Sequence, residues 1–333
     1  MSERFKLYKH LMNGFSYMLP FVVAGGLLIA ISMFGLLDGL FPYINDVGVL
    51  ILSYTYPVLA CFIAFSIADR PGIVVGVAAG ALALAGDSGF IGAIIGGFLA
   101  GYLMELLKLI FKRLPKSLSG IKPILIFPFF GALVIGLIML GVNYVIYPLS
   151  LWLEQTIVTL EGLALLVVAM LLGGLMAVDL GGPINKISYM IGVISIVHGH
   201  DSIIMAAIMV AGMTPPLALA FDVFVFKKDF TELDIKLGKT NIATGLSFIS
   251  EGAIPFVRTY KQKVHIPLII GSILAAMIVA IFQTSVPAPH GGIFVIFLMS
   301  NWWGFLIALV SGTMLSALLI KMMFILGVPH ERN

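Results

Sequence analysis

Long uncharged stretches, separated by short polar connections, run along almost the whole chain. Six of them hold 20 residues or more, at 16–37, 47–68, 123–153, 202–221, 266–289 and 291–320, and shorter apolar runs lie at 71–86, 88–104 and 162–178. A helix of about 20 apolar residues crosses the hydrocarbon core of a bilayer. The pattern predicts an all-α polytopic membrane protein with about ten transmembrane helices, some of them tilted or re-entrant.

The composition agrees with a membrane protein and excludes an ordinary soluble domain. The 333 residues are 60% hydrophobic and 11% charged, and the mean hydropathy is +1.12. Soluble domains carry about 25% charged residues. The first apolar run is too long for a secretory signal and no small-residue cleavage site follows it, so we expect it to be the first transmembrane helix.

The positive charges are distributed unevenly among the connections. With the N-terminus in the cytoplasm, the connections at 38–46, 86–89, 147–161, 198–202 and 285–292 contain no Lys or Arg. This asymmetry is the positive-inside pattern, and it predicts that both termini are cytoplasmic. The cations lie at helix ends rather than on one face, so the net charge of +3 does not indicate nucleic-acid binding.

Glycines at four-residue spacing distinguish the first half of the chain. They occupy positions 72, 76 and 80, and then 92, 96, 97 and 101. Small residues at this spacing let helix backbones approach closely in lipid, so we expect packing seams and a candidate subunit interface there. The chain therefore divides into residues 1–150, with regular helices, and residues 151–333, with helices interrupted by polar residues.

The first interruption is "AVDLGGPINKISY" at 177–189. Asp179 and Lys186 bracket a Gly-Gly-Pro sequence that breaks a helix. Broken backbone in a membrane is tolerated only where protein buries it or water reaches it. The freed backbone groups and Asn185 are suited to hydrogen-bond a polyhydroxylated solute. A plain cytoplasmic turn is the alternative.

The second interruption, 244–256, carries the carboxylate of Glu251 among apolar residues. The segment is too short to span, lies between basic clusters and contains helix-breaking Gly and Pro. We expect a re-entrant hairpin that enters from the cytoplasm and presents Glu251 near membrane depth. An unpaired carboxylate there is costly, which makes the residue a functional candidate. An interfacial ion pair with Arg258 or Lys261 is the alternative.

The third interruption, "SVPAPHGGIF" at 285–294, places His290 between two prolines and two glycines. A histidine can accept or donate a proton near physiological pH. A histidine at the outer membrane interface is the alternative. His198 and His200 lie beside Asp201, but no further clustered ligand accompanies them, so we predict no metal site.

Discontinuous helices, re-entrant loops and a few polar groups at the breaks are typical of the midplane sites of transporters. These features predict a transporter for a small polar solute. They do not distinguish a sugar from an ion or an amino acid.

Six motifs add a family resemblance. In chain order they are "HLMNGFSYMLPFVVAGGLL", "SIADRPG", "DLGGPINK", "GMTPPLALA", "SEGAIPF" and "PAPHGGIF", between residues 10 and 294. Together they resemble the membrane-spanning IIC component of the fructose-type phosphoenolpyruvate-dependent phosphotransferase system.

The resemblance implies a multi-pass permease of the bacterial inner membrane that moves fructose or a similar sugar inward. A phosphocysteine on a separate IIB protein, itself supplied by a IIA protein, would donate the phosphate, so the chain acts as an enzyme only together with IIB. No cofactor is implied. Members of the family are typically homodimers, with residues 1–150 expected to form the dimer scaffold and residues 151–333 the sugar-translocating region.

The resemblance also assigns roles to residues. Glu251 matches the family's carboxylate, which is expected to bind the sugar hydroxyls and to orient or deprotonate the acceptor. His290 lies in an intact Pro-His-Gly-Gly motif and becomes the second catalytic candidate. Ser250 stands where the family usually has Thr, and it keeps the hydroxyl. A third motif adds the substrate-binding candidates Asp179, Asn185 and Lys186.

Two rival functions belong to other classes. An ion-coupled secondary transporter would use Glu251 as its coupling carboxylate, and a regulatory membrane receptor would tolerate the loss of Glu251 best. The basic segments at 227–239 and 258–263 form a hypothetical cytoplasmic docking surface for IIB.

Overall fold

The computed structural model describes residues 3–33, 40–113, 115, 120–196 and 201–326, and it divides into two compact units. The N-terminal unit is Met1–Thr156 and the C-terminal unit is Ile157–Asn333. The described residues contain no strand beyond one isolated antiparallel bridge between Ser202 and Val286. The prediction of an all-α protein is therefore confirmed.

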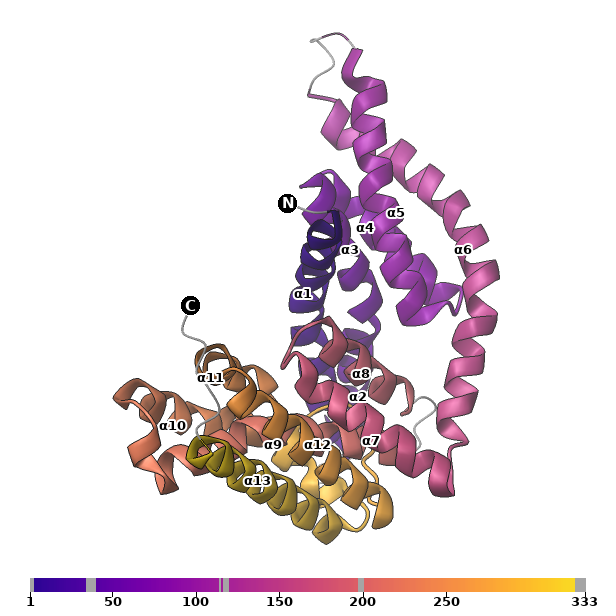
Figure 1. Ribbon diagram of the computed structural model, residues 1–333. Coiled ribbons are helices and arrows are strands. Elements are labelled where there is room, and N and C mark those ends of the chain that lie inside the picture. The colour runs from indigo at the N-terminus through magenta and orange to yellow at the C-terminus, as the bar shows by residue number, and fades with distance from the viewer. Residues whose placement is uncertain (1–2, 34–39, 114, 116–119, 197–200, 327–333) are drawn as a thin grey trace. The chain divides into compact units, whose positions relative to one another are not determined.

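The N-terminal unit is built from helices, several of which are joined by short turns within the described residues (Figure 1). A π-helical turn, Lys122–Ile126, leads into the longest helix, which continues past the end of the unit. The helices are α1 (Glu3–Ser32), α2 (Leu40–Ser53), α3 (Thr55–Ala68), α4 (Gly72–Ala85), α5 (Gly89–Ile110) and α6 (Phe127–Val158).

Glycines form the packing seams expected from the sequence. At Gly76 of α4, a Cβ atom would lie 2.7 Å from the Cα of Cys61 on α3. At Gly97 of α5, it would lie 2.9 Å from the Cα of Ala60, also on α3. Without side chains at these points, α4 and α5 both pack directly on the backbone of α3.

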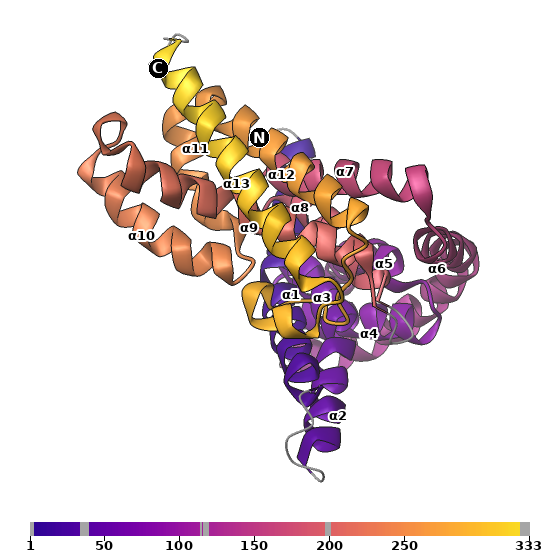
Figure 2. The same ribbon diagram turned by 90° about the horizontal axis from the view of Figure 1, so that it is seen from below.

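The C-terminal unit surrounds one buried helix, α9 (Ile203–Val225), which packs against α7, α8, α10, α12 and α13. Figure 2 shows α13 running beside α12, with α10 on the other side of α9. The other helices are α7 (Gly162–Val178), α8 (Pro183–Ile194), α10 (Glu232–Leu246), α11 (Ile254–Tyr260), α12 (Gln262–Ile281) and α13 (Trp302–Ile325), with 3₁₀ turns at Lys227–Asp229, Ser250–Ala253 and Gly292–Leu298.

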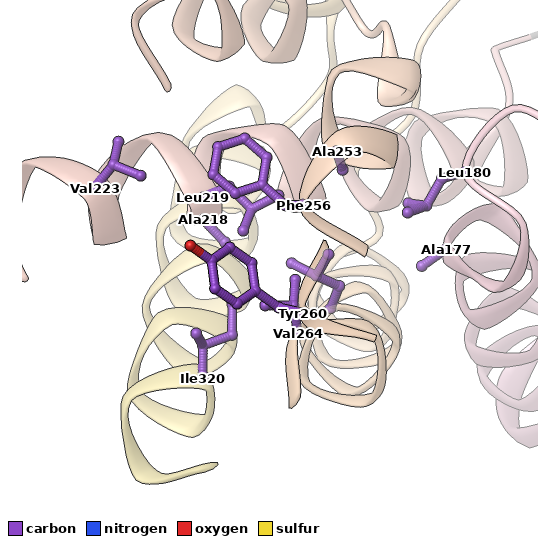
Figure 3. Close-up of a cluster of buried hydrophobic side chains, with 11 residues drawn as sticks. Ala177, Leu180, Ala218, Leu219, Val223, Ala253, Phe256, Tyr260, Val264 and Ile320 are labelled. Atoms are coloured by element: carbon purple, nitrogen blue, oxygen red, sulfur yellow. The ribbon is translucent and has the colours of Figure 1, made fainter. Parts of the chain in front are cut away.

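A hydrophobic cluster anchors α11, the short helix that follows Glu251 (Figure 3). Phe256 is fully buried against Leu219 of α9, and Tyr260 packs near Ile320 of α13. The Tyr260 hydroxyl donates to Asp234 Oδ2 at 2.6 Å, which ties α11 to the start of α10. Burial and this hydrogen bond raise the pKa of the Tyr260 hydroxyl above its ordinary value.

Seven helices in the described part of the chain are long and apolar enough to cross a membrane. The prediction of about ten spans is not confirmed. Two further apolar helices, α4 and α7, have only 14 and 17 residues, and their crossing stays a prediction. With α2 and α3 taken together as one span, the seven cover Lys6–Ser32, Leu40–Ala68, Gly89–Arg113, Lys122–Val158, Ile203–Val225, Gln262–Ile281 and Trp302–Ile325.

The seam on α4 leads to a testable difference between two glycines. A Cβ at Gly80 would overlap the carbonyl oxygen of Tyr56 and lie 2.6 Å from the Cα of Pro57, whereas a Cβ at Gly136 in α6 would meet nothing within 4 Å. We expect Gly80→Ala to lower the free energy of unfolding by about 1–3 kcal/mol through overpacking. Gly136→Ala is expected to be neutral or stabilising by up to about 1 kcal/mol. Thermal melting of the detergent-solubilised variants measures this, and equal midpoints would contradict the seam.

Candidate functional site

Three interruptions of the helices come together in the C-terminal unit, and each contains backbone in the left-handed region. Leu180 (φ +48°) and Gly181 (φ +113°) lie between α7 and α8, and Phe248 (φ +62°) lies between α10 and Glu251. Gly291 (φ +134°) and Gly292 (φ +57°) follow His290. A bulky residue such as Phe rarely adopts this conformation, and such strain clusters at functional sites.

The start of α8 is fixed by Asp179. Its Oδ2 accepts a hydrogen bond from the backbone N–H of Ile184 at 2.8 Å, and its Oδ1 accepts one from the backbone N–H of Asn185 at 2.9 Å. A carboxylate in this position satisfies two of the free amides at a helix N-terminus and complements the helix dipole. The geometry gives Asp179 a capping role, and its predicted contact with substrate stays a prediction.

Asn185 joins the first interruption to the second. Its Nδ2 donates to the carbonyl oxygen of Met176 at 2.7 Å and to Ser250 Oγ at 3.2 Å. Asn185 and Ser250 are both buried, with 1% and 3% of their surface exposed. The amide therefore holds the 3₁₀ turn Ser250–Ala253 against the end of α7.

The next residue on α8, Lys186, forms an ion pair with Glu251. The Lys186 Nζ lies 2.6 Å from Glu251 Oε1, with side-chain exposures of 7% for the lysine and 40% for the glutamate. Gly181 leaves room for this carboxylate, because a Cβ there would lie 2.6 Å from Glu251 Cγ and 2.8 Å from its Oε1. The two residues were predicted separately from the sequence. Their pairing was not.

His290 is held by aromatic rings. Its imidazole centroid lies 5.1 Å from that of Phe248 and 6.0 Å from that of Tyr189, which it meets nearly at right angles. The hydroxyl of Tyr189 donates to the carbonyl oxygen of Pro289 at 3.1 Å. The Nδ1 atom of His290 is buried and has no hydrogen-bond partner among the described residues.

The structure thus brings five residues predicted from the sequence into one region: Asn185, Lys186, Ser250, Glu251 and His290. Asp179 fixes the start of α8, the helix that carries Asn185 and Lys186. Sequence reasoning missed Tyr189, Phe248 and the role of Gly181. A signal for Tyr189 existed, because a residue three positions after Lys186 shares its helix face.

This arrangement can bind and polarise a polar solute. The partly exposed carboxylate of Glu251 can accept hydrogen bonds from hydroxyl groups, and the buried ammonium of Lys186 lies behind it. Within the described ranges, no three His, Cys, Asp or Glu side chains form a group that could hold a metal ion. His198 and His200 lie outside those ranges.

Comparisons with known proteins agree on one family. The model of the family "Phosphotransferase system, EIIC" matches residues 12–265. The fructose-specific EIIABC component of Bacillus subtilis (strain 168) is 39% identical over 329 residues, which cover 94% of this chain and 51% of that protein. The fructose permease IIC component of Bacillus amyloliquefaciens is 39% identical over 273 residues, which cover 81% of this chain and 88% of that one.

One more curated relative and one solved structure also match the chain. The fructose-specific EIIB'BC component of Escherichia coli (strain K12) is 41% identical over 326 residues, which cover 93% of this chain and 57% of that protein. The chain therefore spans only about half the length of several curated relatives it matches. A crystal structure of the IIC transporter from an N,N'-diacetylchitobiose-specific phosphotransferase system aligns with a TM-score of 0.46 at 15% identity, covering 97% of this chain and 92% of that one.

Lys186 is more deeply buried than Glu251, so we expect the two substitutions that remove these charges to lower the free energy of unfolding by different amounts. Glu251→Gln leaves the buried Lys186 ammonium without a counter-charge, so we expect the free energy of unfolding to fall by about 2 kcal/mol. Lys186→Met leaves a carboxylate that water can reach, and the expected loss is below about 1 kcal/mol. SDS-induced unfolding of the solubilised protein measures both values.

The ion pair between Lys321 and Asp229 provides the control. Its atoms are also 2.6 Å apart, but both side chains are partly exposed, at 30% and 23%. Asp229→Asn is expected to cost less than about 1 kcal/mol. A larger loss for Lys186→Met than for Glu251→Gln would contradict the asymmetry.

Proposed function

Because the chain belongs to the phosphotransferase system EIIC family, we propose that it carries fructose or a fructose-like sugar inward and presents it to a phosphorylated IIB protein. The observation that carries this proposal is the partly exposed Glu251 carboxylate, paired with buried Lys186, in a chain whose relatives are named as fructose-specific components. Relatives whose names join B and C components support a IIB partner. The ion-coupled alternative has no support in these comparisons.

In the proposed transfer, Glu251 accepts a hydrogen bond from the acceptor hydroxyl of the sugar. The hydroxyl oxygen attacks the phosphorus of the IIB phosphocysteine, the S–P bond breaks, and the sulfur leaves as a thiolate. The proton of the hydroxyl passes to the Glu251 carboxylate. Positioning and charge stabilisation dominate such transfers, so the transfer needs both the fixed position of the carboxylate and its negative charge.

The other predicted residues support this step. His290 is the second group proposed to contact the sugar, through a nitrogen that donates to or accepts from a second hydroxyl. Asn185 and Ser250 hold the turn that carries Glu251, through their 3.2 Å hydrogen bond. In this proposal Asp179 acts at a distance from the sugar, by fixing the start of α8.

The proposal includes a membrane arrangement. The segment between α10 and α11 enters the membrane from the cytoplasm as a re-entrant hairpin. Both termini are cytoplasmic, and the distribution of Lys and Arg supports this orientation. Residues 1–150 form the scaffold of a homodimer and residues 151–333 translocate the sugar. Support comes from the seven apolar helices and from the interrupted helices of the C-terminal unit.

The first test uses membrane vesicles, purified phosphorylated IIB and radiolabelled fructose. The native protein is expected to form sugar phosphate only when phosphorylated IIB is present. Glu251→Gln is expected to lower the rate at least about a hundredfold, because it removes the proton acceptor while keeping the side-chain shape. Product analysis by anion exchange separates free fructose from its phosphate.

Glu105→Gln is the matched control, because it removes a half-exposed carboxylate that pairs with Lys108 in the N-terminal unit. Its rate is expected to equal that of the native protein. Accumulation of free sugar by native vesicles in response to a pH gradient, without any phosphorylated IIB, would refute the proposal.

A second test concerns where IIB docks. Exposed cations of the C-terminal unit lie on one stretch of chain around the hairpin: Lys227, Lys228, Lys236, Lys239, Arg258 and Lys261. We propose that they attract an acidic face of IIB. Replacing Lys236 and Lys239 of α10 by Glu is expected to raise the KM for phosphorylated IIB by about tenfold at low salt, with a smaller effect at high salt.

The same charge change at Lys112 and Arg113, in the N-terminal unit, serves as the control and is expected to leave that KM unchanged. Equilibrium binding of fructose is expected to be the same in all variants. An unchanged KM for the α10 variant rejects this docking surface without affecting the proposed chemistry.

A further inference from the structure

The orientation of His290 has an unusual origin. A functional histidine is normally oriented by a hydrogen bond from one ring nitrogen to a carbonyl or carboxylate. His290 lacks such a bond at Nδ1 within the described part of the chain, although only 6% of the residue is exposed. Its orientation must therefore come from the groups that enclose it.

Two aromatic rings enclose the imidazole. Tyr189 and Phe248 meet each other edge-on at 5.6 Å, and each also contacts His290. Phe248 is in turn fixed by its neighbours, because Gly292 packs against the backbone of Leu246 and Phe248 so closely that a side chain at Gly292 would overlap the Leu246 carbonyl oxygen. The rings of Tyr189, Phe248 and His290 thus come from three different segments of the chain, which pack together here.

Tyr189 also forms a hydrogen bond through its hydroxyl group. Its hydroxyl donates to the carbonyl oxygen of Pro289, the residue that directly precedes His290. This bond connects α8, which carries Asn185 and Lys186, to the backbone of the histidine segment. Tyr189 is 3% exposed, too buried to be offered to solvent in this structure.

We propose that Tyr189 is a positioning residue, which sets the imidazole of His290 relative to the Glu251–Lys186 pair through the Pro289 carbonyl and the ring of Phe248. The expected effect of Tyr189 on the rate of sugar phosphorylation rests on the proposed function. The rigid placement itself is a property of the fold. A displacement of about 1 Å at a reacting group is enough to lower a rate substantially.

The neighbouring residue Ser188 offers a matched control. It is fully buried on the same helix, and its hydroxyl also donates a single hydrogen bond to a backbone carbonyl, that of Leu172 on α7, at 2.9 Å. Tyr189→Phe and Ser188→Ala each remove one buried hydroxyl from α8. Only the first removes a contact with the histidine segment.

The experiment is a double-mutant cycle on the full chain, with radiolabelled fructose and phosphorylated IIB. Tyr189→Phe is expected to lower kcat/KM about tenfold in the native background and less than about twofold in a His290→Asn background. Ser188→Ala is expected to stay within about twofold of its parent in both backgrounds. An equal loss from Tyr189→Phe in both backgrounds, or an equal loss from Ser188→Ala, would show a general structural effect and overturn the proposal.

Hydrogen–deuterium exchange provides a second reading that needs no substrate. Peptides covering residues 287–292 are expected to exchange faster in Tyr189→Phe than in the native protein and Ser188→Ala. Unchanged exchange in Tyr189→Phe overturns the proposal. If native protein forms no sugar phosphate, the proposed function fails, and the exchange experiment still decides whether Tyr189 fixes the histidine segment.

Discussion

One ionic contact joins two segments of the C-terminal unit that lie 65 positions apart in the chain. Lys186 is buried on α8, and its ammonium requires a counter-charge that only Glu251 is seen to supply among the described ion pairs. A buried charge without a partner is far more costly than a paired one, so the contact fixes the 3₁₀ turn that carries Glu251 relative to α8. The neighbouring features serve the same contact: Asp179 caps α8, and Gly181 leaves space for the carboxylate.

The interrupted backbone is tolerated because packing compensates for its conformational strain. Each left-handed residue at the three breaks costs of the order of 1–3 kcal/mol unless it is Gly. Phe248 is retained in this conformation because its ring is enclosed by Tyr189 and His290. After the turn that carries Glu251, Phe256 and its cluster bury α11, so this turn is held at both ends.

The sequence allowed the fold class and the key charged residues to be predicted, because few charges occur in this apolar chain and each one stands out. The number of spans could not be predicted, because apolar runs do not show where a helix turns or ends short. Pro215 and Pro216 lie inside α9 without ending it, since tertiary packing overrides their local effect. The pairing of Lys186 with Glu251 depends on long-range topology, and Tyr189 and Phe248 look like ordinary apolar residues until the breaks are brought together.

Which of the two partners in the ion pair is buried matters for the proposed chemistry. If the carboxylate were the buried partner, a solute could not reach its oxygen atoms. Here the cation is buried and the side chain of Glu251 is 40% exposed, so the carboxylate is accessible to a solute. His290 packs against the rings of Phe248 and Tyr189, and its buried Nδ1 has no hydrogen-bond partner within the described residues. Under the proposed function, such a site presents one carboxylate to the solute and places a histidine beside it, and the two groups together can orient a hydroxyl.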